Sequence, residues 1–488
     1  MRRNYAKAMF YGWVLIIPMF LRGSLSVYAE SITPTEQLDF ADGLLDKGFY
    51  RMAAEEYRRF IESFPESEYV AEAYFGLAES LFYSKLYSEA IDWYRKYSEH
   101  FPAGKDYVAS ALRTGQILFL ANKYDEALDH FSSIKKDNLN AAELQTLYFY
   151  TGKVHGAKGE KDKAVQVFKE AVGANPSKDS ELTSLALLEI GDMLSAESDY
   201  EKAVPYYVKA QECACSEEVV NVAVYKQAEA YFYAGNYTTA GELFRGIVKK
   251  RPAGGILQDS LANLLLSSFY DSAYKDVVSE YEKNEGLITN GKAFLNAYYI
   301  VACAYAELER YDEALSILDK LLASDSLSEE NRQRAFLKKA EILIKAKRFG
   351  AAKDLLEVHI GKTQSESAEP LFLRAEAFYG LGNYGASYIL YKEISEKFTA
   401  SPFYDYAIYN MAYALKADGK ERPAIRSFIK YFHTGKDKRK REEALYNAIL
   451  TEKELTLTKD AIRHSRIFLS AFKNGNKYDK VLFQLGLF

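Results

Sequence analysis

Residues 73–102 read AYFGLAESLFYSKLYSEAIDWYRKYSEHFP, and the same pattern returns along the chain about every 37 residues. The reference point of each copy is a small residue, which is Ala90 in this one. Eleven further copies align on Ala53, Ala127, Ala164, Ala203, Ala240, Val277, Ala314, Ala352, Ser387, Ala424 and Ala461. Self-similarity over such a length indicates a solenoid of stacked supersecondary units.

Each copy predicts two helices joined by a turn. In nine of the twelve copies an aromatic residue follows the small residue by four positions, as Tyr94 follows Ala90. A spacing of four keeps both side chains on one helical face, and a small residue is needed where two backbones approach closely. Upstream, residues 73–83 place apolar side chains at helical spacing. Gly or Asn often separates the two segments, as Gly48 and Asn122 do, because these residues tolerate positive φ. Each unit is therefore predicted to be a helical hairpin.

The residues at fixed positions resemble the tetratricopeptide repeat. Its pattern of Trp or Tyr, Leu, Gly or Ala, Tyr, then Ala, Phe or Tyr, and Pro is matched by Tyr74, Leu77, Ala78, Leu81, Ala90, Tyr94 and Pro102. The resemblance covers roughly residues 35–473. It implies an all-α fold, a right-handed α-solenoid of about twelve hairpins, with a period near 37 instead of the usual 34.

The connections between hairpins suggest a narrower likeness. Segments such as 64–69 (FPESEY) and 101–107 (FPAGKDY) are similar to those of bacterial cell-envelope repeat proteins. These are the outer-membrane-assembly lipoproteins and the periplasmic coordinator associated with the Tol-Pal system. This chain has no Cys before Cys213, so it departs from the lipoprotein branch and is not expected to be acylated at an N-terminal Cys.

The first 29 residues have the features of a signal peptide. A basic start (Arg2, Arg3, Lys7) precedes 14 mostly apolar residues, 8–21, and small residues end the segment at Ala29. We expect cleavage between Ala29 and Glu30, with export to the periplasm or cell envelope; a retained N-terminal anchor is the alternative. The predicted organisation is a signal peptide (1–29), a solenoid (30–473) and a C-terminal capping segment (474–488).

Composition excludes several function classes. The first 29 residues hold four of the 63 Lys and Arg and no acid, so 59 basic residues face 68 acidic ones in the remainder, a net charge of about −9. An acidic chain argues against nucleic acid as a partner. Three cysteines make no disulfide framework, and the six histidines lie in six different units. We expect no enzyme activity, no cofactor and no metal site.

A basic stretch at 436–441 lies at the junction of the last two units. It reads as a solvated loop, or alternatively as a docking site for anionic lipid or for an acidic partner; peripheral envelope association is left open.

The resemblance also implies where partners bind, because in this family the first helices line a concave groove. Mapped onto this chain, the groove positions give an aromatic row of Phe75, Phe82, Phe149, Tyr225, Phe232, Phe269, Tyr299, Phe372, Tyr379 and Tyr409, with acids at Glu79, Glu229 and Glu376 among others. Such a lining suits an apolar peptide with basic residues, although the rings could merely pack between hairpins.

Two functions follow from this reading. The first is a non-enzymatic scaffold of the bacterial cell envelope that binds partner proteins or peptides along the groove, in outer-membrane or envelope assembly. The second is a peptidoglycan-binding accessory of cell-wall metabolism, with the aromatic rings stacking on sugars.

Overall fold

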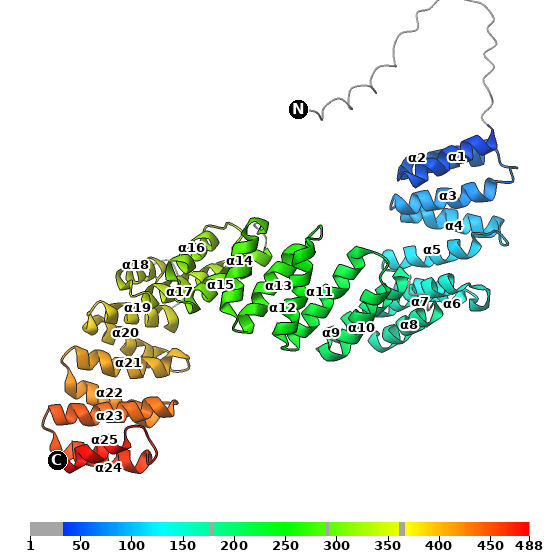
Figure 1. The fold of residues 1–488 in the computed structure, drawn as a ribbon. Coiled ribbons are helices and arrows are strands. Elements are labelled where there is room, and N and C mark those ends of the chain that lie inside the picture. Colours follow the sequence, from blue (N-terminus) through cyan, green and yellow to red (C-terminus); the bar gives the residue numbers. More distant parts are fainter. Residues whose placement is uncertain (1–32, 176–179, 289–291, 361–366, 488) are drawn as a thin grey trace, which may run out of the picture. The chain divides into compact units, whose positions relative to one another are not determined.

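The computed structural model describes residues 33–175, 180–288, 292–360 and 367–487, and every regular element in these ranges is a helix. The predicted signal peptide and its cleavage position lie outside the described residues. The chain divides into two compact units, Met1–Asn175 and Pro176–Phe488. Within each unit, consecutive helices lie side by side and pack against each other (Figure 1).

The first unit contains four helical hairpins. They are α1 (Pro34–Asp46) with α2 (Tyr50–Ser63), α3 (Val70–Tyr83) with α4 (Tyr87–His100), α5 (Tyr107–Leu120) with α6 (Tyr124–Ser133), and α7 (Ala141–Ala157) with α8 (Lys161–Ala174). A short 3-10 helix, η1 (Lys136–Asn138), follows α6.

The second unit continues with eight hairpins and one further helix. The hairpins are α9 (Glu181–Ala196) with α10 (Tyr200–Cys213), α11 (Glu217–Tyr233) with α12 (Tyr237–Lys250), α13 (Ile256–Tyr270) with α14 (Tyr274–Asn284), α15 (Lys292–Glu307) with α16 (Tyr311–Leu322), α17 (Glu329–Lys345) with α18 (Phe349–Ile360), α19 (Ala368–Gly380) with α20 (Tyr384–Lys397), α21 (Phe403–Ala417) with α22 (Glu421–Thr434), and α23 (Lys438–Glu454) with α24 (Thr458–Ala471). The 3-10 helix η2 (Glu285–Leu287) follows α14, and α25 (Tyr478–Leu487) packs against α24.

The twelve small residues that define the repeat are all buried at 0% exposure, each near the start of the second helix of its hairpin. The aromatic residue four positions later is also buried in all nine copies that have one. The prediction of twelve helical hairpins is therefore confirmed, and the small residues lie in the interior as expected.

Every hairpin turn ends its first helix in the same way. After α1, the amide of Gly48 donates to the carbonyl of Leu45 and that of Phe49 to Leu44, the double hydrogen bond of a Schellman cap. The capping residue has positive φ in all twelve turns. Gly or Asn fills six of these positions, as predicted, whereas Lys85, Ser198, Ser272, Glu309, Lys347 and Thr456 fill the others. The repeat therefore imposes this conformation even where the side chain disfavours it.

In some hairpins a glycine of the first helix faces an aromatic ring of the second. A Cβ added to Gly191 on α9 would lie 2.5 Å from the ring of Tyr207 on α10. The Tyr207 hydroxyl donates to Asp192 at 2.8 Å, so the ring cannot tilt away without loss of this bond. We expect Gly191→Ala to lower the free energy of unfolding by about 1–3 kcal/mol, measured by urea denaturation.

A matched glycine separates this clash from helix propensity. Gly246 lies inside α12, is exposed, and has no atom within 4 Å of an added Cβ. Gly246→Ala should therefore stabilise the protein by about 0.5–1 kcal/mol. Equal effects of the two substitutions would contradict the close approach at Gly191.

Candidate functional site

The predicted groove residues all lie on first helices. The structure places Phe75, Glu79 and Phe82 on α3, Phe149 on α7, Tyr225, Glu229 and Phe232 on α11, Phe269 on α13, Tyr299 on α15, Phe372, Glu376 and Tyr379 on α19, and Tyr409 on α21. Phe149 is buried at 7% exposure, Tyr379 is exposed, and the other rings are half-buried. The set divides between the two compact units, and whether it binds a partner stays a prediction.

Most of these rings also pack inside their own hairpin. Four of them contact an aromatic ring 19 residues later on the second helix, in the pairs Phe75–Tyr94, Phe149–Phe168, Tyr225–Phe244 and Phe372–Tyr391, with ring centroids 5.6–6.0 Å apart. Four others contact a ring five residues later, in the pairs Phe82–Tyr87, Phe232–Tyr237, Phe269–Tyr274 and Tyr379–Tyr384. A partner would meet only the part of each ring that this packing leaves exposed.

Two of the three predicted groove acids accept hydrogen bonds from side chains of neighbouring helices. Glu79 accepts from the hydroxyl of Tyr94 at 2.5 Å and from Nε of Arg113 at 2.9 Å. Glu376 accepts from the hydroxyl of Tyr391 and from the side-chain amide of Asn410. The same link, between residues 15 positions apart, joins Asp42 to Tyr57 and Asp192 to Tyr207. These acids link neighbouring helices by hydrogen bonds. A test of their role in binding must therefore first show that the variant is folded.

The third predicted acid, Glu229, is in a different environment. Burial raises its pKa above the ordinary range, and the nearby Asp192 and Asp259 act in the same direction, against Lys226 and the Tyr225 hydroxyl. Its carboxylate lies 3.9 Å from Nζ of Lys226. A half-buried carboxylate with two acidic neighbours and one weakly placed cation is the groove acid best suited to a basic group of a partner.

Three exposed tyrosines were not among the groove residues predicted from the sequence. Tyr83, Tyr233 and Tyr270 each end a first helix and are 42–62% exposed. Each stacks on the tyrosine that begins the second helix of the preceding hairpin, in the pairs Tyr50–Tyr83, Tyr200–Tyr233 and Tyr237–Tyr270, with centroids 5.2–5.5 Å apart. The sequence signal was available as a tyrosine pair 33 residues apart, but the positions mapped from the family did not include them.

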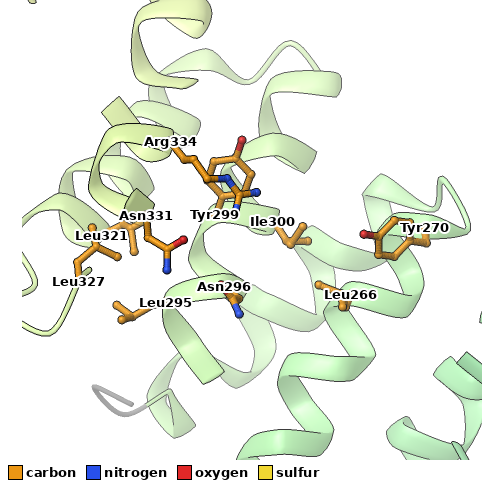
Figure 2. Close-up of a pocket in the computed structure, with 10 residues that line it drawn as sticks. All are labelled: Leu266, Tyr270, Leu295, Asn296, Tyr299, Ile300, Leu321, Leu327, Asn331 and Arg334. Atoms are coloured by element: carbon orange, nitrogen blue, oxygen red, sulfur yellow. The ribbon is translucent and has the colours of Figure 1, made fainter. Parts of the chain in front are cut away.

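A pocket of about 240 Å³ lies among α13, α15, α16 and α17 (Figure 2). Tyr270 and Leu266 come from α13, and Tyr299 comes from α15. The guanidinium of Arg334, on α17, lies 5.2 Å from the centre of the Tyr299 ring. Further lining residues are Leu295, Asn296, Ile300, Leu321, Leu327 and Asn331.

The chemistry of this pocket differs from the predicted lining. Among the described residues that line it, Arg334 is the one with a charged side chain, and none is an Asp or a Glu. Of its residues, sequence mapping identified only Tyr299. Asn296 and Arg334 were missed because each stands two residues before the leading aromatic of its hairpin, Tyr298 and Phe336, whereas the mapped positions all follow that aromatic.

No catalytic or metal-binding cluster stands out in the parts of the chain that the structure describes. Within them, no group of three or more His, Cys, Asp and Glu side chains is arranged to hold a metal ion. Nor is any helix in the described ranges both long and apolar enough to cross a bilayer. The buried titratable pair His464 and Glu452, 2.7 Å apart, joins α24 to α23.

Comparisons with known proteins point to one repeat family. Models described as tetratricopeptide repeat match residues 38–105, 147–178, 222–253 and 302–365. No curated protein sequence matches the chain significantly.

Three solved structures illustrate the similarity. A tetratricopeptide repeat protein from Parabacteroides merdae is 16% identical, covers 55% of this chain and 98% of its own, and superposes with a TM-score of 0.40. The C-terminal part of a repeat-containing protein from Cytophaga hutchinsonii is 18% identical, covers 53% and 97%, and has a TM-score of 0.41. A chain of the Cut9–Hcn1 hetero-tetramer of the APC/C is 12% identical, covers 94% and 99%, and has a TM-score of 0.37.

Similarities at these TM-scores carry no argument about function. The repeat models, together with the twelve hairpins, their buried small residues and their common turn, do identify the fold family. Repeats of this kind generally mediate protein–protein binding, and this chain belongs to the tetratricopeptide repeat proteins.

Proposed function

We propose that this chain is a non-enzymatic scaffold of the bacterial cell envelope that holds partner proteins on the exposed faces of its first helices. The observation that carries the proposal is the pocket beside Tyr299, which opens on those helices and is flanked by the exposed Tyr270. Support for the envelope location comes from the signal-like segment 1–29 and from the Phe-Pro connections between hairpins.

The pocket suits an anchor side chain of a protein partner. Its volume of about 240 Å³ is below that of sites for drug-sized ligands and is of the order that one large apolar side chain fills. Leu295, Ile300 and Leu321 supply apolar surface, while Asn296 and Arg334 offer hydrogen-bond donors. A pocket that combines apolar contacts with hydrogen-bond donors can hold an amphipathic anchor side chain such as tyrosine.

Site-specific photo-crosslinking tests this proposal in cells that produce the full chain. A benzophenone side chain placed at the exposed Asn296 should give discrete crosslinked products with one or a few proteins. The same group at Ser316, exposed on the second helix α16, is the matched control and should give none of them. Products shared by both positions, or none at Asn296, would contradict protein binding in this pocket.

Peptidoglycan is the competing ligand class, because Tyr233 and Tyr270 present exposed ring surface. Phe232→Ala is a poor probe of it, since Phe232 packs against Tyr233, Tyr237 and Tyr270. Tyr233, at 62% exposure, is the better position. Cosedimentation with purified peptidoglycan that Tyr233→Ala abolishes, together with a negative crosslinking result, would overturn the protein-scaffold proposal in favour of glycan binding.

A further inference from the structure

The C-terminal part of the chain has the opposite charge to the rest. Residues 421–488 contain 15 Lys and Arg against 8 Asp and Glu, a net charge of +7, whereas the whole chain has a net charge of −5. These residues form α22, α23, α24 and α25. The basic stretch at 436–441 is part of this region, but only its first residues are a loop, because α23 begins at Lys438 with Asp437 as its N-cap. The solvated-loop reading was therefore wrong for Lys438 to Arg441.

Six of these cations lie on the two second helices α22 and α24, which carry only one acid each. The residues two before and two after the repeat's small residue are Arg422 and Arg426 on α22, and Lys459 and Arg463 on α24. Because these are equivalent positions of consecutive repeats, the four side chains project from the same side of consecutive hairpins. In the other ten hairpins the same twenty positions hold two cations, Arg51 and Lys275, against nine acids.

The acids of this region are largely engaged within the fold. Asp437 accepts from the backbone amides of Arg439 and Lys440, and Glu442 accepts from that of Lys477. Glu452 pairs with the buried His464, and Glu454 pairs with Lys416. These contacts fix carboxylates that would otherwise offset the surface cations.

Of the six cations on α22 and α24, five remain free to meet an external anion. Arg422, Arg426, Lys430, Lys459 and Arg466 are all exposed, and among the described residues none of them lies at ion-pair distance from a carboxylate. We call these five residues the basic face. Arg463 is set apart because it pairs with Asp460 at 3.0 Å.

Apolar side chains accompany the basic face. Ile467 is 38% exposed on α24, one residue after Arg466 and four after Arg463. On α25, which packs against α24, Leu482, Phe483 and Leu487 are 49–66% exposed. Exposed cations on α24, with protruding apolar side chains on the same helix and on the helix packed against it, match the layered chemistry of an anionic bilayer, with phosphate headgroups outside and acyl chains beneath.

We propose that the basic face, with Ile467 and the exposed side chains of α25, docks the protein peripherally on anionic phospholipid membranes. Each Lys or Arg near such a surface contributes about 1 kcal/mol, so five unpaired cations with a few apolar contacts are sufficient for reversible binding. This inference uses residues other than the pocket at Tyr299, so it stands or falls independently of the proposed function.

Vesicle cosedimentation with the purified full chain tests the proposal. We expect binding to vesicles containing about one-third phosphatidylglycerol, little binding to pure phosphatidylcholine, and a fall in affinity as salt rises. Replacing all five residues of the basic face by Glu should weaken binding to the anionic vesicles at least tenfold. Ile467→Asp and Phe483→Asp, tested separately, should each weaken it severalfold.

A control variant with the same change in net charge separates the effect of the basic face from that of total charge. Five exposed cations on other second helices, Arg51, Lys169, Lys209, Lys275 and Lys283, replaced by Glu should leave vesicle binding within about twofold, since they lie outside the basic face. Equal losses in both variants, equal binding to the two vesicle types, or no vesicle binding by the parent protein would overturn the proposal. So would self-association of the chain, seen by sedimentation velocity without lipid, that the basic-face variant removes while vesicle binding is absent.

Discussion

Replacing His464 by leucine should lower the free energy of unfolding of the second unit by about 3–5 kcal/mol, because it leaves a carboxylate buried without its partner. His464 and Glu452 have side chains 8% and 2% exposed, and Nδ1 of the histidine lies 2.7 Å from Oε1 of the glutamate. The other oxygen of Glu452 has no hydrogen-bond partner among the described residues. Hydrogen exchange of the α23 and α24 amides would locate the loss.

The double variant His464→Leu with Glu452→Leu is the control for this prediction. It removes the buried carboxylate together with the histidine, so its stability should return to near that of the parent protein, since replacing a buried pair by apolar residues is often neutral or stabilising. A coupling energy near zero in the double-mutant cycle would show that the two side chains act independently and would contradict the prediction.

Glu79→Ala should destabilise the first unit by about 2–4 kcal/mol, because two donors lose their acceptor at once. Glu79 is 9% exposed and connects three helices, accepting from Tyr94 on α4 and from Arg113 on α5. Burial raises the pKa of Tyr94, and the charge of Glu79 adds to the shift, so the phenol stays a hydrogen-bond donor. In a Trp13→Phe background, Trp93 on α4 is the single tryptophan, and its fluorescence in urea reports on this unit.

Glu89→Ala is the matched control on the same unit. Glu89 lies on α4, its side chain is 56% exposed, and it faces Arg58 at 3.7 Å. Exposed pairs contribute little, so we expect a change below about 0.5 kcal/mol. If Glu79→Ala cost no more than this control, Glu79 would have no structural role, and the sequence prediction of a groove acid would be the better description of it.

The fold was predictable because the repeat itself encodes it. One small residue about every 37 positions, with an aromatic four residues later in nine copies, was sufficient to predict all twelve second helices. Half of the turns were recognisable from Gly or Asn. The other half were not, because residues such as Lys85 and Glu309 adopt positive φ only when the two packed helices impose it.

The division of the chain into two compact units was not predicted. It falls between residues 175 and 176, within the longest spacing of the repeat, the 39 residues from Ala164 to Ala203. Two extra residues are too weak a signal to distinguish a longer loop from a boundary, because loop length alone costs little free energy.

The candidate site was also only partly predictable from the sequence. Sequence position placed Glu79, Glu376 and the aromatic row on the first helices, but it could not say which side chains keep free surface. That depends on contacts between residues 15, 19 or 33 positions apart, such as Tyr94 with Glu79 and Tyr237 with Tyr270.

By itself, the sequence determined the hairpin, its repetition and its family, because these depend on helical periodicity and on residue volume at one close contact. Only the tertiary structure decided that Glu79 and Glu376 are held by neighbouring helices and that Arg334 and Tyr299 share a pocket. It also decided that five of the six cations on α22 and α24 have no carboxylate at ion-pair distance among the described residues. The physical reason is that the exposed surface of a side chain depends on what packs around it, and in a solenoid those neighbours come from the same hairpin and from the adjacent ones.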